Sequence, residues 1–180
     1  DSEGTLNIGG AASTGPRGAG ALDIVEDINI GQSGLLVFNH LESTYQFDTR
    51  LESTVFRAGR VEQRAGTTVL TSDQSAYTGA MHVMGGTLIV NGNLGSPLVE
   101  VDAGATLGGS GVINDILAHD GAIISPGNSP GVLTVTGDLV MQPGAVLRLE
   151  VLGDVPGTQH DVIEVAGDAS LNGAIIELVF

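Results

Sequence analysis

Residues 127–131 read Gly-Asn-Ser-Pro-Gly and fit the G-x-S-x-G pattern of the turn that presents a nucleophilic serine in many hydrolases. Such a turn joins a strand to a helix, and the backbone N–H after the serine binds the oxyanion. Here the next residue is Pro130, which has no N–H. The following VLTVTGDLV alternates and is rich in β-branched residues, which predicts a strand. We therefore predict that Ser129 lies in a turn between two strands and is not a nucleophile.

A metal or acid–base site would need histidines or cysteines at suitable spacing. The chain has no Cys, which excludes disulfides, thiolate ligands and thiol catalysis. Its histidines are widely separated and form neither H-x-H nor H-E-x-x-H; they are His40, His82, His119 and His160. The calcium-binding G-G-x-G-x-D repeat is absent. We predict no metal site and no cofactor.

Two aspartates are candidates for carbohydrate chemistry. Asp115 and Asp120 could meet carboxylates of a neighbouring segment and form a cleft of the glycosidase or lyase type. Because acidic residues of this chain fall mainly in turns or at outward positions, a solvated face is the preferred interpretation. Thr134 and Thr136 form a single T-x-T pair, whereas an ice-binding face would repeat it. The sequence therefore predicts no catalytic residue, and we expect no enzyme activity.

The charge of the chain limits its partners. The formal net charge is -15, which argues against binding to nucleic acid or to an anionic membrane surface. All six basic residues are Arg, and four of them cluster: Arg50, Arg57, Arg60 and Arg64. Because Glu52 and Glu62 lie between them, this stretch predicts a mixed solvated face and not an anion site.

Composition and periodicity both indicate an all-β protein with a narrow core. There are 28 Gly among 180 residues, and aromatic residues make up 3%. Short apolar runs recur at a spacing of about ten residues, separated by turns that contain Gly, Asn, Asp or Pro. The alternation is clear late in the chain, where Leu147, Leu149 and Val151 point one way and Arg148 and Glu150 the other.

The same turn chemistry recurs along the chain. The segments DAGATL, HDGAII and QPGAVL each pass from a turn through Gly and Ala into an apolar strand. Short strands that cannot bury their apolar faces alone must stack on their neighbours, which is the logic of a solenoid. We therefore predict a right-handed parallel β-helix of about eight rungs, with rungs about 4.8 Å apart and a rod about 40 Å long.

Motifs in the middle of the chain resemble the repeat of bacterial autotransporter (type V secretion) passenger domains. The matching residues are Gly66-Thr67-Thr68, Tyr77-Thr78-Gly79, Gly86-Thr87-Leu88 and residues 104–111, GATLGGSG. LLVFNHLESTYQF, residues 35–47, and SPGNSPGVLTVTGDL resemble the segments that flank this repeat. The chain departs from the pattern at Met81, His82 and Met84, where small residues and Thr are usual.

The resemblance implies a structural role outside the cell. Residues 1–180 would be one β-helical segment of a longer passenger, with a C-terminal outer-membrane β-barrel translocator in the same polypeptide. Residues 122–180 would be candidate autochaperone-like stem rungs, and the uncapped ending AIIELVF also leads us to expect a longer chain. We expect a stem that supports secretion, folding and display of a distal effector, at the bacterial cell surface or outer membrane or secreted. An adhesin surface for a host or matrix ligand, and a carbohydrate-active β-helix enzyme, remain as alternatives.

Overall fold

The chain folds into parallel strands stacked along one axis. The computed structural model describes residues 4–10, 15, 17–19, 27–53 and 58–180, and within these ranges its regular elements are all strands. Every pairing between two named strands is parallel. In the part of the chain that the structure describes, no helix is long and apolar enough to span a membrane.

Four sheets make up the walls of the stack. The largest has eight strands in the order β1 (Thr5–Gly9), β3 (Leu35–Asn39), β6 (Arg60–Ala65), β8 (Ala80–Val83), β10 (Leu98–Val101), β13 (Asp115–Ala118), β16 (Leu139–Met141) and β19 (Ala169–Ser170). The second has seven strands: β4 (Tyr45–Phe47), β7 (Thr67–Leu70), β9 (Thr87–Val90), β11 (Thr106–Gly109), β14 (Ile123–Pro126), β17 (Val146–Glu150) and β20 (Ile175–Val179). The smaller sheets contain β12 (Val112–Ile113), β15 (Val132–Val135) and β18 (Val162–Val165), and β2 (Ile28–Asn29) with β5 (Leu51–Glu52).

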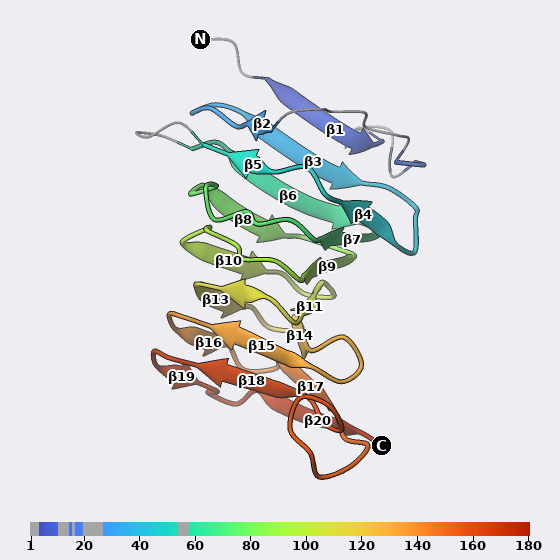
Figure 1. Ribbon diagram of the computed structural model, residues 1–180, viewed down its shortest axis with the longest axis vertical. Helices are drawn as coiled ribbons and strands as arrows, with labels where there is room; N and C mark the ends of the chain where they lie inside the picture. Colours follow the sequence, from blue (N-terminus) through green and yellow to red (C-terminus); the bar gives the residue numbers. More distant parts are fainter. Residues whose placement is uncertain (1–3, 11–14, 16, 20–26, 54–57) are drawn as a thin grey trace.

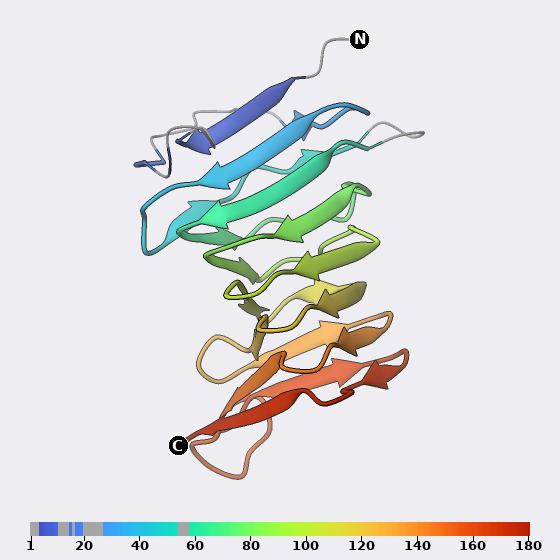
Figure 2. The same ribbon diagram turned by 180° about the vertical axis from the view of Figure 1, so that it is seen from behind.

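Successive coils follow one another from the N-terminal to the C-terminal end (Figures 1 and 2). Each strand of the eight-stranded sheet comes from a different coil, which confirms the predicted parallel β-helix of about eight rungs. The coils differ in length: Met81 pairs with Val99, whereas Leu139 pairs with Ala169. Part of the extra length forms the loop between β17 and β18, which projects from the stack near the C-terminal end (Figure 1).

The core consists of aliphatic side chains stacked in register. In the eight-stranded sheet one inward column runs through Leu36, Val61, Met81, Val99, Ile116 and Leu139, each no more than 1% exposed. In the seven-stranded sheet the facing column runs through Leu88, Leu107, Ile124 and Leu147. Burying one such side chain stabilises the fold by about 1.5–3 kcal/mol. Because each one contacts like side chains in the coils above and below, few aromatic residues are needed.

The turns that lead into the seven-stranded sheet also stack on one another. Gly104, Gly121, Gly144 and Gly173 occupy the same turn position with φ between 76° and 86°. The N–H of each of the first three donates to the carbonyl of the next, at 2.9, 3.3 and 3.1 Å. The Ala that follows each of the first three glycines is fully buried. The repeated turn in the sequence is therefore a hydrogen-bonded ladder that fixes where these four coils enter their strands of the seven-stranded sheet.

Replacing Gly144 by Ala should destabilise the protein by about 1–3 kcal/mol, because a side chain at a left-handed φ is strained. The added Cβ would also lie 2.0 Å from Oδ1 of Asp120. Urea unfolding followed by circular dichroism measures the loss. Gly31→Ala is the matched control, since nothing lies within 4 Å of the added Cβ. Equal unfolding midpoints for the two variants would show that the turn ladder does not need glycine.

Candidate functional site

The SPGNSPG segment connects strand β14 to strand β15, which confirms the predicted turn. Ser129 has a φ of 67°, and its hydroxyl donates to Oε2 of Glu150 at 2.8 Å. Nδ2 of Asn128 donates to Oδ1 of Asn91 at 2.7 Å and to Oγ of Ser110 at 2.9 Å. These contacts bind the turn to two earlier coils and to β17.

A depression of about 320 Å³ lies beside this turn. Its lining includes Ser129, Arg148, Glu150 and Asp161. A serine nucleophile needs an adjacent base and donors for the oxyanion. Ser129 donates to the Glu150 carboxylate, and Arg148 is already paired through Nε with Oε2 of Glu177 at 2.6 Å. Within the described ranges, the lining of the depression contains no histidine base, and Pro130 supplies no N–H for an oxyanion, so the turn is not arranged for acyl transfer.

Asp161 holds the turn in place from the following coil. Its side chain is 8% exposed, and its two oxygens accept the backbone N–H groups of Gly131 at 2.9 Å and Glu150 at 2.8 Å. Hydrogen bonds to a charged group contribute about 1.5–3 kcal/mol each. Sequence analysis missed this residue because its partners lie 30 and 11 residues away and no local motif marks it.

The acidic candidates also have structural partners. Asp115 accepts the N–H of Asp138 at 2.9 Å through Oδ1, and Asp138 accepts the N–H of Asp168 at 2.8 Å in the same way. This is a ladder of carboxylates along one corner. Asp120 is exposed and follows the other end of β13, so the structure does not bring Asp115 and Asp120 together. The repeated Gly-Asp at residues 137–138 and 167–168 is the sequence signal that could have identified the ladder.

Each histidine contacts a different group. His82 Nε2 is 3.0 Å from Oδ1 of Asp102, His119 Nε2 is 4.0 Å from Oε2 of Glu100, and His160 Nδ1 is 3.0 Å from the carbonyl oxygen of Gly153. His40 is fully buried in a polar network. Among the described residues, no group of three or more His, Cys, Asp or Glu side chains is placed to hold a metal ion.

The arginine-rich stretch forms ion pairs on the outside of the stack. Nε of Arg60 is 2.8 Å from Oε1 of Glu62, and Nη2 of Arg64 is 2.5 Å from its Oε2. Arg50 approaches Asp27 and Glu52 at 3.8 and 4.0 Å. The predicted mixed face is confirmed for these residues, while Arg57 lies outside the described ranges. One detail differs: Glu62 is only 3% exposed, because the two arginines cover it.

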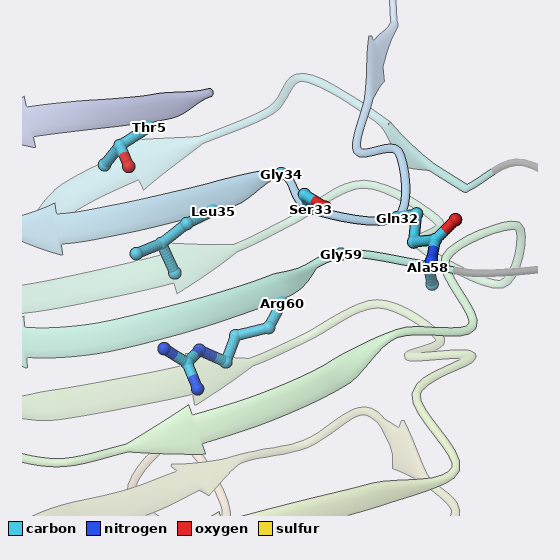
Figure 3. Close-up of a pocket in the computed structure, with 8 residues that line it drawn as sticks. All are labelled: Thr5, Gln32, Ser33, Gly34, Leu35, Ala58, Gly59 and Arg60. Carbon is cyan, nitrogen blue, oxygen red and sulfur yellow. The ribbon is translucent and has the colours of Figure 1, made fainter. Parts of the chain in front are cut away.

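A second depression, of about 360 Å³, has Arg60 in its lining (Figure 3). Thr5, Leu35 and Arg60 come from the adjacent strands β1, β3 and β6 and line it together with residues 32–34, 58 and 59. Its one charged group, Arg60, is 59% exposed and already paired with Glu62. This arrangement provides a shallow polar contact surface and contains no nucleophile paired with a base.

The sequence is similar to part of an autotransporter adhesin. The adhesin autotransporter BmaC of Brucella suis biovar 1 (strain 1330) is 34% identical to this chain over 173 residues. The alignment covers 91% of the chain and 5% of that adhesin, so the chain corresponds to a small part of its length. No protein-family model and no solved structure matches the chain.

Removing the side chain of Asp161 should cost about 3 kcal/mol or more of unfolding free energy, because two backbone N–H groups lose a charged acceptor. The test compares Asp161→Ala with Ser129→Ala in urea unfolding. Ser129 is at the exposed tip of the same turn, so its variant should stay within about 0.5 kcal/mol of the parent. A Ser129→Ala variant as unstable as Asp161→Ala would mean that the serine hydroxyl anchors the turn.

Proposed function

Because this chain is related to a region of an autotransporter adhesin, we propose that it is a non-enzymatic stem of an autotransporter passenger. The stem supports secretion, folding and surface display of a distal effector. As an autotransporter segment, the chain is located at the bacterial cell surface, in the outer membrane or outside the cell.

The observation that carries this proposal is the unbroken parallel ladder from β1 to β19 over an aliphatic core. The polar groups that could do chemistry are used inside the chain. Ser129, Asp161 and Asp115 each bind a neighbouring coil or strand. A rod whose polar side chains form contacts between coils is suited to holding another domain away from the cell, and not to catalysis.

Folding itself supplies the mechanism of the stem. A coil that forms outside the outer membrane buries several aliphatic side chains, each contributing about 1.5–3 kcal/mol. Moving back through a translocator would require unfolding that coil and losing this free energy. In a stack where each repeat contacts only its neighbours, a folded coil also templates the next one. Coil-by-coil folding therefore favours outward movement without another energy source.

Residues 122–180 are proposed as the autochaperone-like rungs of this stem. Support comes from residues 122–147, where Ala122, Ile124, Leu133, Val135, Leu139, Met141 and Ala145 are at most 1% exposed. The aspartate and glycine ladders also run through this part.

The partner of the stem in this proposal is the C-terminal outer-membrane translocator of the same polypeptide. Nucleic acid is not a partner that the charge favours, because a net charge of -15 repels phosphate. The relative's name, adhesin, favours a second candidate function. In that case the outer face around Arg60 and Leu35 would contact a host surface or matrix ligand.

The stem proposal is tested in the full-length polypeptide that contains this chain. Ile124→Asp places a charge in the core, where Ile124 is fully buried, and should abolish surface display. The control is the double variant Asp115→Asn and Asp120→Asn, which keeps an acceptor oxygen at both positions and should be displayed normally. Labelling of intact cells with a membrane-impermeant reagent measures display.

Normal display of Ile124→Asp would contradict a folding-driven stem. Loss of host binding in Arg60→Gln, with normal display, would instead favour the adhesin surface. Failure of display in the double Asp variant, with an unchanged circular dichroism spectrum of the purified segment, would also count against a purely structural role for these carboxylates.

A further inference from the structure

One corner of the interior carries polar side chains where other coils carry apolar ones. Gln63 points inward in register with Phe38 and Val83, and Thr68 points inward in register with Leu88. His40 joins them at the turn after β3. His40, Gln63 and Thr68 are each 0% exposed. The core is therefore interrupted, in the upper part of the stack, by three buried polar side chains.

Hydrogen bonds fix the orientation of each group in this corner. Nε2 of Gln63 donates to the carbonyls of Ala65 at 2.9 Å and Gly66 at 3.1 Å, so its amide oxygen faces Thr68. The Thr68 hydroxyl donates to that oxygen at 2.6 Å. Nε2 of His40 lies 2.9 Å from Oγ1 of Thr68.

The other ring nitrogen meets a carboxylate. Nδ1 of His40 is 3.1 Å from Oε2 of Glu42, and neither atom forms a well-aligned hydrogen bond. The chain Gln63–Thr68–His40–Glu42 thus has three contacts between acceptor atoms. The Thr68 hydroxyl and a neutral imidazole supply two protons. With His40 neutral, one of the three contacts lacks a proton.

A third proton would satisfy the chain but would place a charge on a ring that water does not reach. Burial lowers the pKa of His40, and the Glu42 carboxylate opposes that shift with a smaller effect. Glu42 also accepts the N–H of Ala19 at 2.7 Å, which holds the pKa of its carboxyl below the ordinary value.

The surroundings leave the ring little freedom. Among the described residues, the titratable side chain of Tyr45 also packs against it, with a ring centroid 5.3 Å from that of His40. Arg17 forms a backbone β-bridge with His40, and Arg17 itself is exposed. On the next coil Gly66 covers the ring so closely that a Cβ there would lie 2.2 Å from Nδ1. His40 therefore cannot reach water without local opening.

We propose that this His40 corner is an acid-labile joint of the β-helix. Uptake of a proton by His40 opens the corner and releases the coils above it before the lower coils unfold. Below the corner the inward columns are aliphatic and carry no buried histidine within the described residues. The proposal concerns the folding chemistry of the rod and is independent of its role as a stem.

The direction of the pH effect follows from linkage. The folded-state pKa of His40 is lowered, so the unfolded chain takes up the proton first. The contribution of the neutral His40 to the free energy of unfolding is therefore fully present above the unfolded histidine pKa of about 6.5. This contribution is lost as the pH falls from that value toward the lower pKa of His40 in the folded protein.

The test measures the urea midpoint at pH 7.5 and pH 5.5 for the parent chain, His40→Asn and the control His119→Gln. The control residue is partly exposed, so its variant should behave like the parent. We expect the midpoint of the parent and of the control to fall on acidification, and His40→Asn to lose most of that fall. Equal pH profiles for the parent and His40→Asn, or a rise in stability on acidification, would overturn the proposal.

A second variant keeps the test valid if His40→Asn does not fold. Glu42 is 35% exposed, so Glu42→Gln should fold, and without the carboxylate the loss on acidification should grow. Hydrogen exchange of the parent at the lower pH locates the opening. Protection should fall first in β3, β4, β6 and β7 and later in β10, β11 and β13. A uniform loss of protection along the rod would contradict a local joint.

Discussion

The parallel backbone ladder between successive coils is the constraint on which the rest of the structure depends. Each strand is about 4.8 Å from the next, so every side chain must fit above and below a counterpart at the same register. Aliphatic residues meet this condition in columns such as Val99–Ile116–Leu139. It also explains how a chain with only 3% aromatic residues forms an apolar core, since each coil adds one layer of side chains to it.

The same spacing governs the corners. Where two coils turn, a side chain on one coil would meet the backbone of its neighbour: a Cβ at Gly109 would lie 2.2 Å from the carbonyl oxygen of Val90, and one at Gly79 would lie 2.1 Å from the carbonyl oxygen of Gly59. The Tyr77 hydroxyl donates to the same carbonyl of Gly59 at 3.0 Å. The motifs that resemble the autotransporter repeat are thus the residues that let coils approach. Their recurrence reflects packing geometry and does not require a shared ligand.

Much of the fold could be predicted from the sequence because its signals are local. Alternation gives the strands, recurring Gly-Ala turns give the coils, and Pro130 with the strand after it decides the nature of the Ser129 turn. The contacts that were missed join residues far apart in the chain. Asp161 binds the N–H of Gly131 30 residues earlier, and Thr68 meets His40 across 28 residues. No short motif encodes these pairs, since they depend on how many residues each coil contains.

The polar contacts differ in what they do for the rod. Asp115, Asp138 and Asp161 each accept backbone N–H groups, so their charges are matched by donors that the fold supplies in any case. The His40 corner has no such surplus of donors, because its chain of three contacts ends on a carboxylate. Buried polar groups stabilise only when all are satisfied. The coils of this rod are therefore joined unequally, and we expect them to separate first at the corner where a buried histidine interrupts the apolar columns.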